Sequence, residues 1–214
     1  LADLATTHGL ALIQDAAHAL PARFDGRLVG APVRDGVTSL ASFSFYANKN
    51  LTTGEGGMLT GPSDAIERAR AFSRQGIDAA AGVPVWRRDV TLPGFNYKLP
   101  DTAAALGLCQ LAKLPAFHRR RRGLAARYTA AFRAIPELET PVERNGFGHA
   151  WHLYVVKLAT DRLRIDRDHV VAELAARNIG ANVHFRPVHL LTYYRDRYGL
   201  APDAFPVTMS MWPR

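Results

Sequence analysis

Lys49 stands in the part of this sequence that is best suited to covalent chemistry. It follows Ser44-Phe-Tyr-Ala-Asn and precedes Asn-Leu-Thr-Thr-Gly54-Glu-Gly56-Gly57. A neutral lysine amine can bond to an aldehyde as a Schiff base, and once displaced it can act as a base. Glycines give a neighbouring loop backbone conformations that other residues resist. We therefore interpret Lys49 as a candidate Schiff-base lysine held beside a glycine-rich loop.

A carboxylate and an imidazole follow the earlier apolar run at residues 10–14, in the order Asp15-Ala-Ala-His18. Pyridoxal phosphate (PLP) draws electrons into a protonated pyridine ring, so an enzyme that uses it must hold a carboxylate against the ring nitrogen. Asp15 suits that task, although an aspartate at a strand end can equally cap a helix. His18 can likewise be a structural residue. Together with Lys49, these are the residue types that a PLP site needs.

At these residues the chain resembles the DegT/DnrJ/EryC1/StrS aminotransferases, and the resemblance extends over nearly all of it. A further matching segment is Pro-Gly-Phe-Asn-Tyr-Lys-Leu-Pro-Asp at residues 93–101. Members of this family transfer an amino group onto keto-sugars attached to a nucleotide. The resemblance implies an α/β, fold-type-I architecture like that of aspartate aminotransferase, PLP as cofactor and glutamate as amino donor. It also implies a bacterial homodimer with a shared active site, in lipopolysaccharide, surface-glycan or antibiotic-sugar synthesis.

The resemblance assigns roles to five residues. Lys49 would hold the cofactor covalently and move the proton, and Asp15 would face the ring nitrogen. His18 matches the family position beside the cofactor ring, and Ser44 matches the serine that binds the phosphate. Asn96 matches an asparagine that reaches across the dimer to the partner's cofactor phosphate, whereas without the resemblance it would be read as a turn residue.

A later segment, Val-His-Phe-Arg-Pro-Val-His at 183–189 with Tyr-Tyr-Arg at 193–195, resembles the family segment that closes over the sugar nucleotide. His184, Arg186 and His189 offer donors for a diphosphate or sugar hydroxyls, and Tyr194 offers a face for a base. The two histidines lack the four-residue spacing and neighbouring glutamate of a zinc-binding helix. We therefore predict substrate binding here and no metal site.

The first part of the chain must position the candidate cofactor residues. Strand-like and helix-like patterns alternate, which is typical of α/β proteins. We predict that residues 1–112 are the C-terminal part of the large PLP-binding domain. The expected elements are a helix that ends at Gly9, strands at 10–14, 37–46 and 57–60, and a helix at 65–74 capped by Ser63 or Asp64.

The second part, residues 113–214, is predicted to be a linking helix and a truncated small α/β domain. The helix begins at Asp101, its predicted N-cap, breaks at Pro115 and resumes to about residue 135. The expected elements after it are a strand at 149–158, a helix at 167–177 and a strand at 180–186. The family has further chain before residue 1 and after residue 214, so the sequence is predicted to be a fragment.

Composition excludes several classes of protein. The 48% hydrophobic and 21% charged residues are ordinary for a globular protein, and no apolar run is long enough to cross a membrane. A cytoplasmic location follows as the default. Cys109 is the single cysteine, which excludes an internal disulfide framework. We assign it no chemistry.

The net charge is +8, and the densest basic run is His118-Arg-Arg-Arg-Arg122. Helical spacing leaves most of these arginines on solvated or subunit-facing sides. No aromatic-interleaved basic motif accompanies them, so we predict no nucleic-acid binding. A phosphate-bearing substrate explains the positive charge equally well.

The sequence leaves two alternatives to a sugar aminotransferase to be considered. One is a non-catalytic remnant or binding partner that keeps the fold, against which the intact Asp15, Ser44 and Lys49 argue. The other is the related PLP-dependent sugar 3-dehydratase, which has a histidine where the transaminases have lysine. Lys49 decides against the dehydratase.

Overall fold

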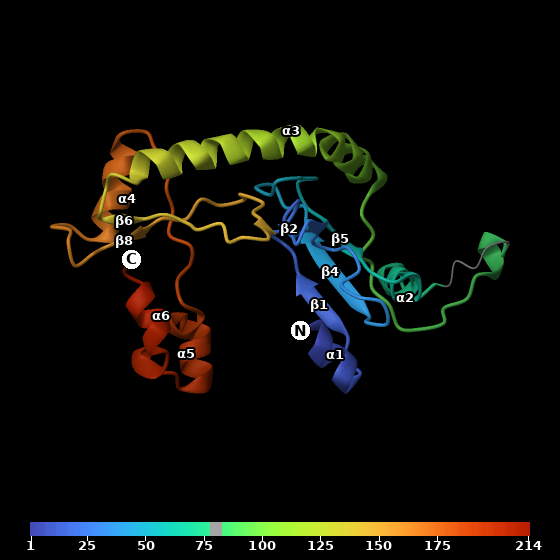
Figure 1. Ribbon diagram of the computed structural model, residues 1–214. Coiled ribbons are helices and arrows are strands. Elements are labelled where there is room, and N and C mark those ends of the chain that lie inside the picture. The colour runs from blue at the N-terminus through green and yellow to red at the C-terminus, as the bar shows by residue number, and fades with distance from the viewer. Residues whose placement is uncertain (78–82) are drawn as a thin grey trace. The chain divides into compact units, whose positions relative to one another are not determined.

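The computed structural model describes residues 1–77 and 83–214 (Figure 1). They fold into two compact units, the first made of Leu1–Ala125 and Glu143–Leu153 and the second of Ala126–Val142 and Tyr154–Arg214. The boundary therefore crosses the long helix α3 (Asp101–Phe132) near Ala125, further along the chain than the predicted division after residue 112. Glu143–Leu153 belongs to the first unit because the strand within it pairs with a strand of that unit.

The first unit is built on a three-stranded sheet in the order β1-β4-β5 (Figure 1). β1 (Leu12–Asp15) runs parallel to β4 (Ser39–Ser44), and β5 (Gly57–Thr60) runs antiparallel to β4. All three strands lie where the apolar patterns predicted them. A parallel pair needs a crossover connection, whereas β4 and β5 are joined by a loop alone.

The alternation of side chains along β4 divides its residues between two faces. Ala41 and Phe43 are buried, and with Phe45 and Leu51 they form a core that Leu114 of α3 completes. The residues between them, Ser42 and Ser44, face the other side and are more exposed. The polar face of the sheet is thus left for a site while the apolar face holds the unit together.

The remaining elements of the first unit are short. α1 (Ala2–His8) ends as predicted at Gly9, whose φ of 60° is left-handed. The helix expected at 65–74 is α2 (Ser63–Ser73), but its N-cap is Pro62, so neither Ser63 nor Asp64 caps it. The other elements are β2 (Arg23–Phe24), β3 (Arg27–Leu28), β7 (Phe147–Gly148), which pairs with β2, and the 3-10 turn η1 (Val85–Arg87).

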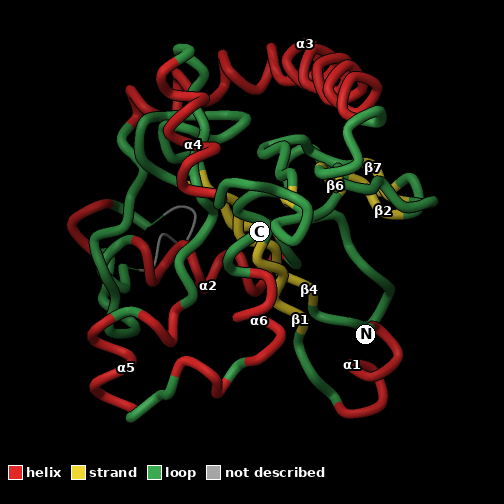
Figure 2. Tube along the Cα trace, turned by 90° about the vertical axis from the view of Figure 1, so that its left-hand side faces the viewer, coloured by secondary structure: helices red, strands yellow, loops and turns green. Residues whose placement is uncertain are grey.

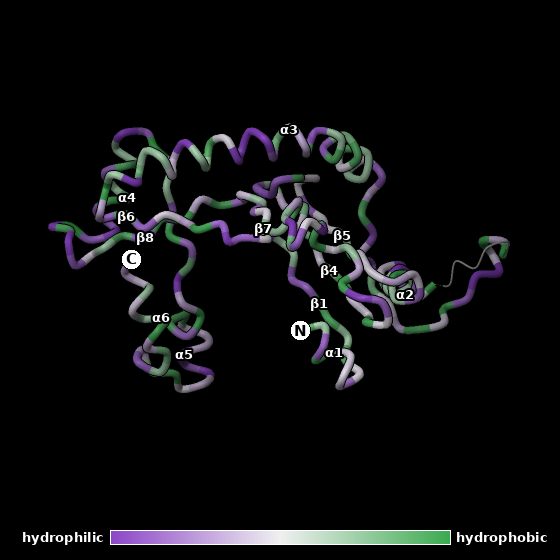
Figure 3. Tube along the Cα trace, viewed as in Figure 1, coloured by the Kyte–Doolittle hydropathy of each residue, from purple (hydrophilic) through white to green (hydrophobic). Residues whose placement is uncertain are grey.

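α3 is one helix of 32 residues, and the predicted break at Pro115 is wrong. Proline cannot donate to the carbonyl four residues earlier and usually kinks a helix. Here the burial of Leu114 in the core and of Ala125 further along stabilises the helix on both sides of the proline. Figure 3 shows hydrophilic turns in the middle of α3. No helix in the described ranges combines the length and apolar character needed to cross a bilayer.

The second unit is mostly helix and loop (Figure 2). Its sheet is a two-residue pairing of β6 (Leu138–Glu139) with β8 (Lys157–Leu158). α4 (Arg167–Ala176) confirms the helix predicted at 167–177, and Asp166 caps it by accepting the His169 N–H. The later elements are η2 (Val188–Leu190), α5 (Thr192–Tyr198), η3 (Pro202–Ala204) and α6 (Pro206–Met211).

Of two strands predicted in this part of the chain, one is much shorter than predicted and the other does not form. Of residues 149–158, only Lys157–Leu158 is a strand. Trp151 has a φ of 50°, which a β-strand cannot contain, so the run is interrupted there. Residues 180–186 form no strand, and the described part of the chain offers them no pairing partner. Apolar alternation alone does not make a strand when no neighbour supplies the ladder of hydrogen bonds.

Candidate active site

Asp15 and Ser44 are the last residues of two neighbouring parallel strands. Parallel strands end at the same edge of a sheet, which is where α/β proteins bind ligands. In the register of the pair, Asp15 lies opposite Ser42. Ser42 and Ser44 are two positions apart and share a face, so the Asp15 and Ser44 side chains leave the sheet on the same side. The sheet thus brings a carboxylate and a hydroxyl to one edge.

The loop from Phe45 to Gly56 carries Lys49 and is closed by its own backbone. The Phe45 N–H donates to the Gly56 carbonyl at 2.8 Å, and the Thr53 N–H donates to the Phe45 carbonyl at 3.0 Å. Within it, the Lys49 N–H donates to the Tyr46 carbonyl at 3.0 Å. These bonds fix the backbone on both sides of Lys49, which positions the lysine just beyond the end of β4.

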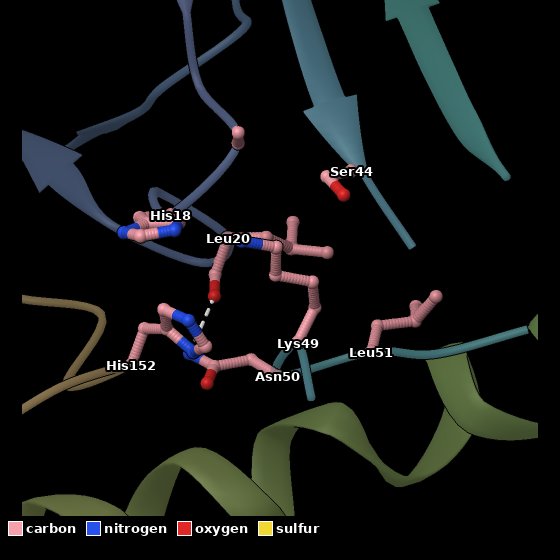
Figure 4. A pocket seen from close by; sticks show the side chains of 8 residues that line it. His18, Leu20, Ser44, Lys49, Asn50, Leu51 and His152 are labelled. Carbon is pink, nitrogen blue, oxygen red and sulfur yellow. Dashed lines mark hydrogen bonds between the residues drawn. The ribbon is translucent and has the colours of Figure 1, made fainter. Parts of the chain in front are cut away.

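Lys49 lines a pocket of the first unit (Figure 4). Its side chain is half-buried and rises from the loop into the space between Ser44 and His18. The lining residues are Ala17, His18, Leu20, Ser44, Lys49, Asn50, Leu51 and His152. Three of the five predicted cofactor residues, His18, Ser44 and Lys49, therefore lie in one pocket. Asp15 is outside the lining but precedes the lining residue Ala17 by two positions.

Asn50, the residue after Lys49, joins three segments of the first unit. Its Nδ2 donates to the Leu20 carbonyl at 2.9 Å, drawn in Figure 4, and to the Ala150 carbonyl at 2.8 Å. Both partners can only accept, which fixes the orientation of the amide. Its Oδ1 is buried and has no hydrogen-bond partner among the described residues. A buried acceptor of this kind needs an explanation, and a donor on a bound molecule would supply one.

Two imidazoles meet at the side of the pocket. The rings of His18 and His152 lie with their centroids 4.4 Å apart at an interplanar angle of 62°. His18 follows β1, and His152 comes from the segment that returns to the first unit after an excursion through the second. Figure 4 shows both rings on the same side of Lys49.

The donors and acceptors of the pocket fit PLP. The Ser44 Oγ accepts the Tyr46 N–H at 3.3 Å, which leaves the hydroxyl hydrogen for a phosphate oxygen. Asp15 Oδ1 accepts the Ala17 N–H at 3.1 Å, which orients the carboxylate and leaves its second oxygen. The enclosed part of the pocket measures about 10 Å³, room for about one water. A ligand the size of PLP would therefore lie on the open side of these residues.

Contacts and backbone conformation within the protein explain why the loop needs glycine at two positions. Gly56 has a φ of 132°, which residues with side chains rarely adopt. A Cβ on Gly57 would lie 2.5 Å from the Phe43 carbonyl oxygen, so the first residue of β5 must lack a side chain to pair with β4. The backbone conformation and the strand pairing therefore explain both glycines.

Asn96 lies away from the pocket lining and is exposed. An isolated bridge pairs it with Arg74, at the end of α2. The rings of Phe95 and Tyr97, on either side of it, stack at 5.0 Å with an interplanar angle of 8° and are also exposed. This placement is compatible with a role toward another subunit.

The predicted substrate residues all lie in the second unit. Arg186 is exposed and donates to the Leu190 carbonyl at 3.2 Å, and the His184 ring meets the Phe185 ring edge-on at 5.8 Å. Tyr194 is partly exposed beside two other tyrosines. His189 differs, because it is only 6% exposed and its Nε2 donates to the Pro202 carbonyl at 3.2 Å.

Two lining residues were absent from the sequence-based site, Asn50 and His152. Asn50 carried a local signal, since a polar residue directly after a candidate catalytic lysine is itself a candidate. His152 matches a family-like residue, but the sequence could not place it beside the pocket, because its partner His18 is far away along the chain.

The chain is similar to known proteins along its whole length. A model of the DegT/DnrJ/EryC1/StrS aminotransferase family matches residues 1–214. The spore coat polysaccharide biosynthesis protein SpsC of Bacillus subtilis is 38% identical over 218 residues, which cover 99% of this chain and 55% of SpsC. DesV of S. venezuelae, solved in complex with a ketimine intermediate, is 31% identical with a TM-score of 0.83, covering 100% of this chain and 53% of DesV.

A second similar structure is Spr1654 of Streptococcus pneumoniae, solved in PMP and PLP forms. The PMP form is 26% identical with a TM-score of 0.83, covering 99% of this chain and 52% of that one. The chain spans about half the length of the relatives it matches. The predicted fold class and cofactor are confirmed: the architecture is α/β, of fold type I, and the family depends on PLP. With the match running along all of residues 1–214, this chain belongs to the DegT/DnrJ/EryC1/StrS aminotransferase family.

Proposed function

We propose that the protein containing this chain transfers an amino group from glutamate to a nucleotide-linked keto-sugar. The observation that carries the proposal is the grouping of Lys49 and Ser44 in one pocket at the strand edge where Asp15 also ends. Membership of a sugar aminotransferase family supports it, as does the likeness to SpsC, a protein of polysaccharide biosynthesis. The reaction would take place in the cytoplasm.

Each residue in or beside the pocket would have its own role in the reaction. PLP, when bound, would supply an electron sink that makes the α-carbon of the donor acidic. The Lys49 amine would hold the cofactor and, once displaced, take the proton from that carbon. The Asp15 carboxylate would keep a proton on the ring nitrogen, and the Ser44 hydroxyl would donate to the phosphate. His18 would lie against the ring.

The proposal includes a homodimer in which Asn96 serves the partner's cofactor phosphate. What supports it is the exposure of Asn96 and of the stacked rings of Phe95 and Tyr97, since exposed apolar groups next to a polar one are typical of protein interfaces. His184, Arg186 and Tyr194 would contact the sugar nucleotide. His189, buried and bonded to Pro202, would hold this segment in shape.

The test is a transamination assay with the full-length protein, glutamate and UDP- or dTDP-linked keto-sugars. We expect an amino sugar and 2-oxoglutarate, with the product lost in Lys49→Ala. Robust amination of free keto acids without any response to keto-sugars would overturn the substrate class. Loss of a sugar hydroxyl without gain of nitrogen would indicate the dehydratase, and the absence of any turnover with bound PLP would indicate a non-catalytic protein.

A further inference from the structure

A second cavity of the first unit lies apart from the Lys49 pocket. It has a volume of about 230 Å³ on the measure by which one water needs about 10–15 Å³, so it has room for a phosphate or diphosphate group. β2, α3 and the segment around β7 contribute its walls. The lining residues are Pro21, Arg23, His118, Arg122, Glu143, Phe147, Gly148 and His149.

The basic run 118–122 contributes two of these residues. His118 and Arg122 are four positions apart and therefore share one face of α3. Arg121 faces elsewhere and donates to the Trp151 carbonyl at 3.3 Å. Arg119 and Arg120 are exposed and outside the cavity lining. Arg122 is exposed as well, as the sequence predicted for most of this run, but unlike Arg119 and Arg120 it lines the cavity.

His149 presents a neutral hydrogen-bond donor. Its Nδ1 accepts the Trp151 N–H at 2.8 Å, so the ring proton of the neutral imidazole lies on Nε2. Burial lowers the pKa of His149, with the Glu143 charge opposing that effect and His118 adding to it. His118 in turn donates from Nε2 to the His149 carbonyl at 2.9 Å, which ties the helix to this segment.

The charged side chains of the lining leave an excess of positive charge. Arg23 donates to the Gly26 carbonyl at 2.6 Å, and Glu143 Oε1 accepts the His149 N–H at 2.6 Å. In the described part of the chain, no carboxylate lies within ion-pair distance of Arg23 or Arg122. Two guanidinium groups therefore stand against one carboxylate, one oxygen of which is already engaged. Guanidinium forks match the paired oxygens of a phosphate.

We propose that this cavity binds a phosphate or diphosphate oxyanion through Arg122 and Arg23, with His149 Nε2 as a neutral donor. The site does not depend on the transamination proposed above. The anion has two possible sources, a free phosphate or diphosphate ion and the diphosphate of a nucleotide. The neighbouring pocket shares the segments that form these walls, since Leu20 lines one pocket and Pro21 the other.

The test is isothermal titration of the PLP-loaded full-length protein with inorganic pyrophosphate at constant ionic strength. We expect saturable binding that weakens about tenfold or more in Arg122→Gln, because a charge-assisted hydrogen bond is lost. Arg122→Lys keeps the positive charge but loses the forked guanidinium, so its affinity for pyrophosphate should lie between those of the wild type and Arg122→Gln. Arg119→Gln is the matched control: it removes the same charge from another exposed position of α3, one outside the cavity lining, and should bind like the wild type.

The results distinguish a specific oxyanion site from non-specific attraction. Equal weakening in Arg119→Gln and Arg122→Gln would show only long-range attraction by a basic surface, and would overturn the site. The absence of saturable binding in the wild type would overturn it as well. If UDP or dTDP displaces pyrophosphate but uridine or thymidine does not, the site binds the diphosphate of a nucleotide. If neither UDP nor dTDP displaces pyrophosphate, the site binds the free ion. Because titration heat and not turnover is measured, failure here leaves the proposed transamination untouched.

Discussion

The amide of Asn50 and the carbonyl of Ala150 are joined by a hydrogen bond of 2.8 Å across a sequence separation of 100 residues. The same Nδ2 also donates to the Leu20 carbonyl. The residue next to the candidate catalytic lysine therefore holds together the strand-end loop, the segment after β1 and the segment that carries His152. The geometry of the pocket depends on this amide.

Asn50→Ala should destabilise the protein by about 1–3 kcal/mol, since one buried and one partly buried carbonyl lose their donor. Asn50→Asp should cost more, because a carboxylate would face two carbonyl oxygens. Urea unfolding monitored by fluorescence measures both, with PLP affinity as a second readout. The control is Asn48→Ala, an exposed change in the same loop that should shift stability by no more than about 0.5 kcal/mol. Equal effects at both positions would contradict the role of Asn50.

Borohydride reduction of the PLP-loaded protein, followed by peptide mapping, should place the pyridoxyl group on Lys49. Lys98 is exposed and serves as the comparison. Lys49→Ala should still bind PLP weakly but lose more activity than the roughly 10²–10⁴-fold typical of one acid-base group, since the covalent link is lost too. A pyridoxyl group on Lys98 instead would remove Lys49 from its proposed role.

Asp15→Asn keeps the shape of the side chain and its bond from the Ala17 N–H but removes the charge that would hold a proton on the ring nitrogen. We expect kcat to fall much more than PLP occupancy, measured by absorbance and by glutamate half-reaction rates. Asp64→Asn, a surface change in α2, is the control and should leave both unchanged. Full turnover of Asp15→Asn at saturating PLP would make Asp15 a structural residue. His18→Gln should have a mild effect.

Asn96 should act on the partner subunit's site. Lys49→Ala and Asn96→Ala proteins, each impaired alone, should regain activity when mixed, because some heterodimers then contain one intact site. Subunit exchange is verified with differently tagged proteins. If exchange occurs and activity does not return, Asn96 acts within its own subunit or outside the site.

Arg186→Ala should raise KM for the sugar nucleotide and leave the glutamate half-reaction close to wild type. Arg195→Ala is the control, since that exposed guanidinium is already paired with Asp196. Single-turnover kinetics of each half-reaction separate the two effects. A defect confined to the glutamate half-reaction would make Arg186 the clamp for the donor's carboxylate.

The sequence alone determined the local parts of this protein. The three strands of the first sheet, the end of α1 at Gly9 and the helix α4 lie where the patterns placed them. Periodicity and glycine preference are properties of neighbouring residues, so they can be read without a fold. The motifs around Asp15 and Lys49 sufficed for the family and its cofactor, while the roles of the individual residues stay predictions.

Tertiary structure decided what depends on distant residues. Packing of Leu114 keeps α3 helical through Pro115, and the left-handed Trp151 ends a run that alternation favoured as a strand. The pairing of His18 with His152 and the reach of Asn50 to Ala150 arise from segments more than 90 residues apart, which no local pattern encodes. Which residues of the basic run line a cavity likewise appears only once β2 and β7 are set beside α3, because the walls of a cavity are formed by neighbours in space.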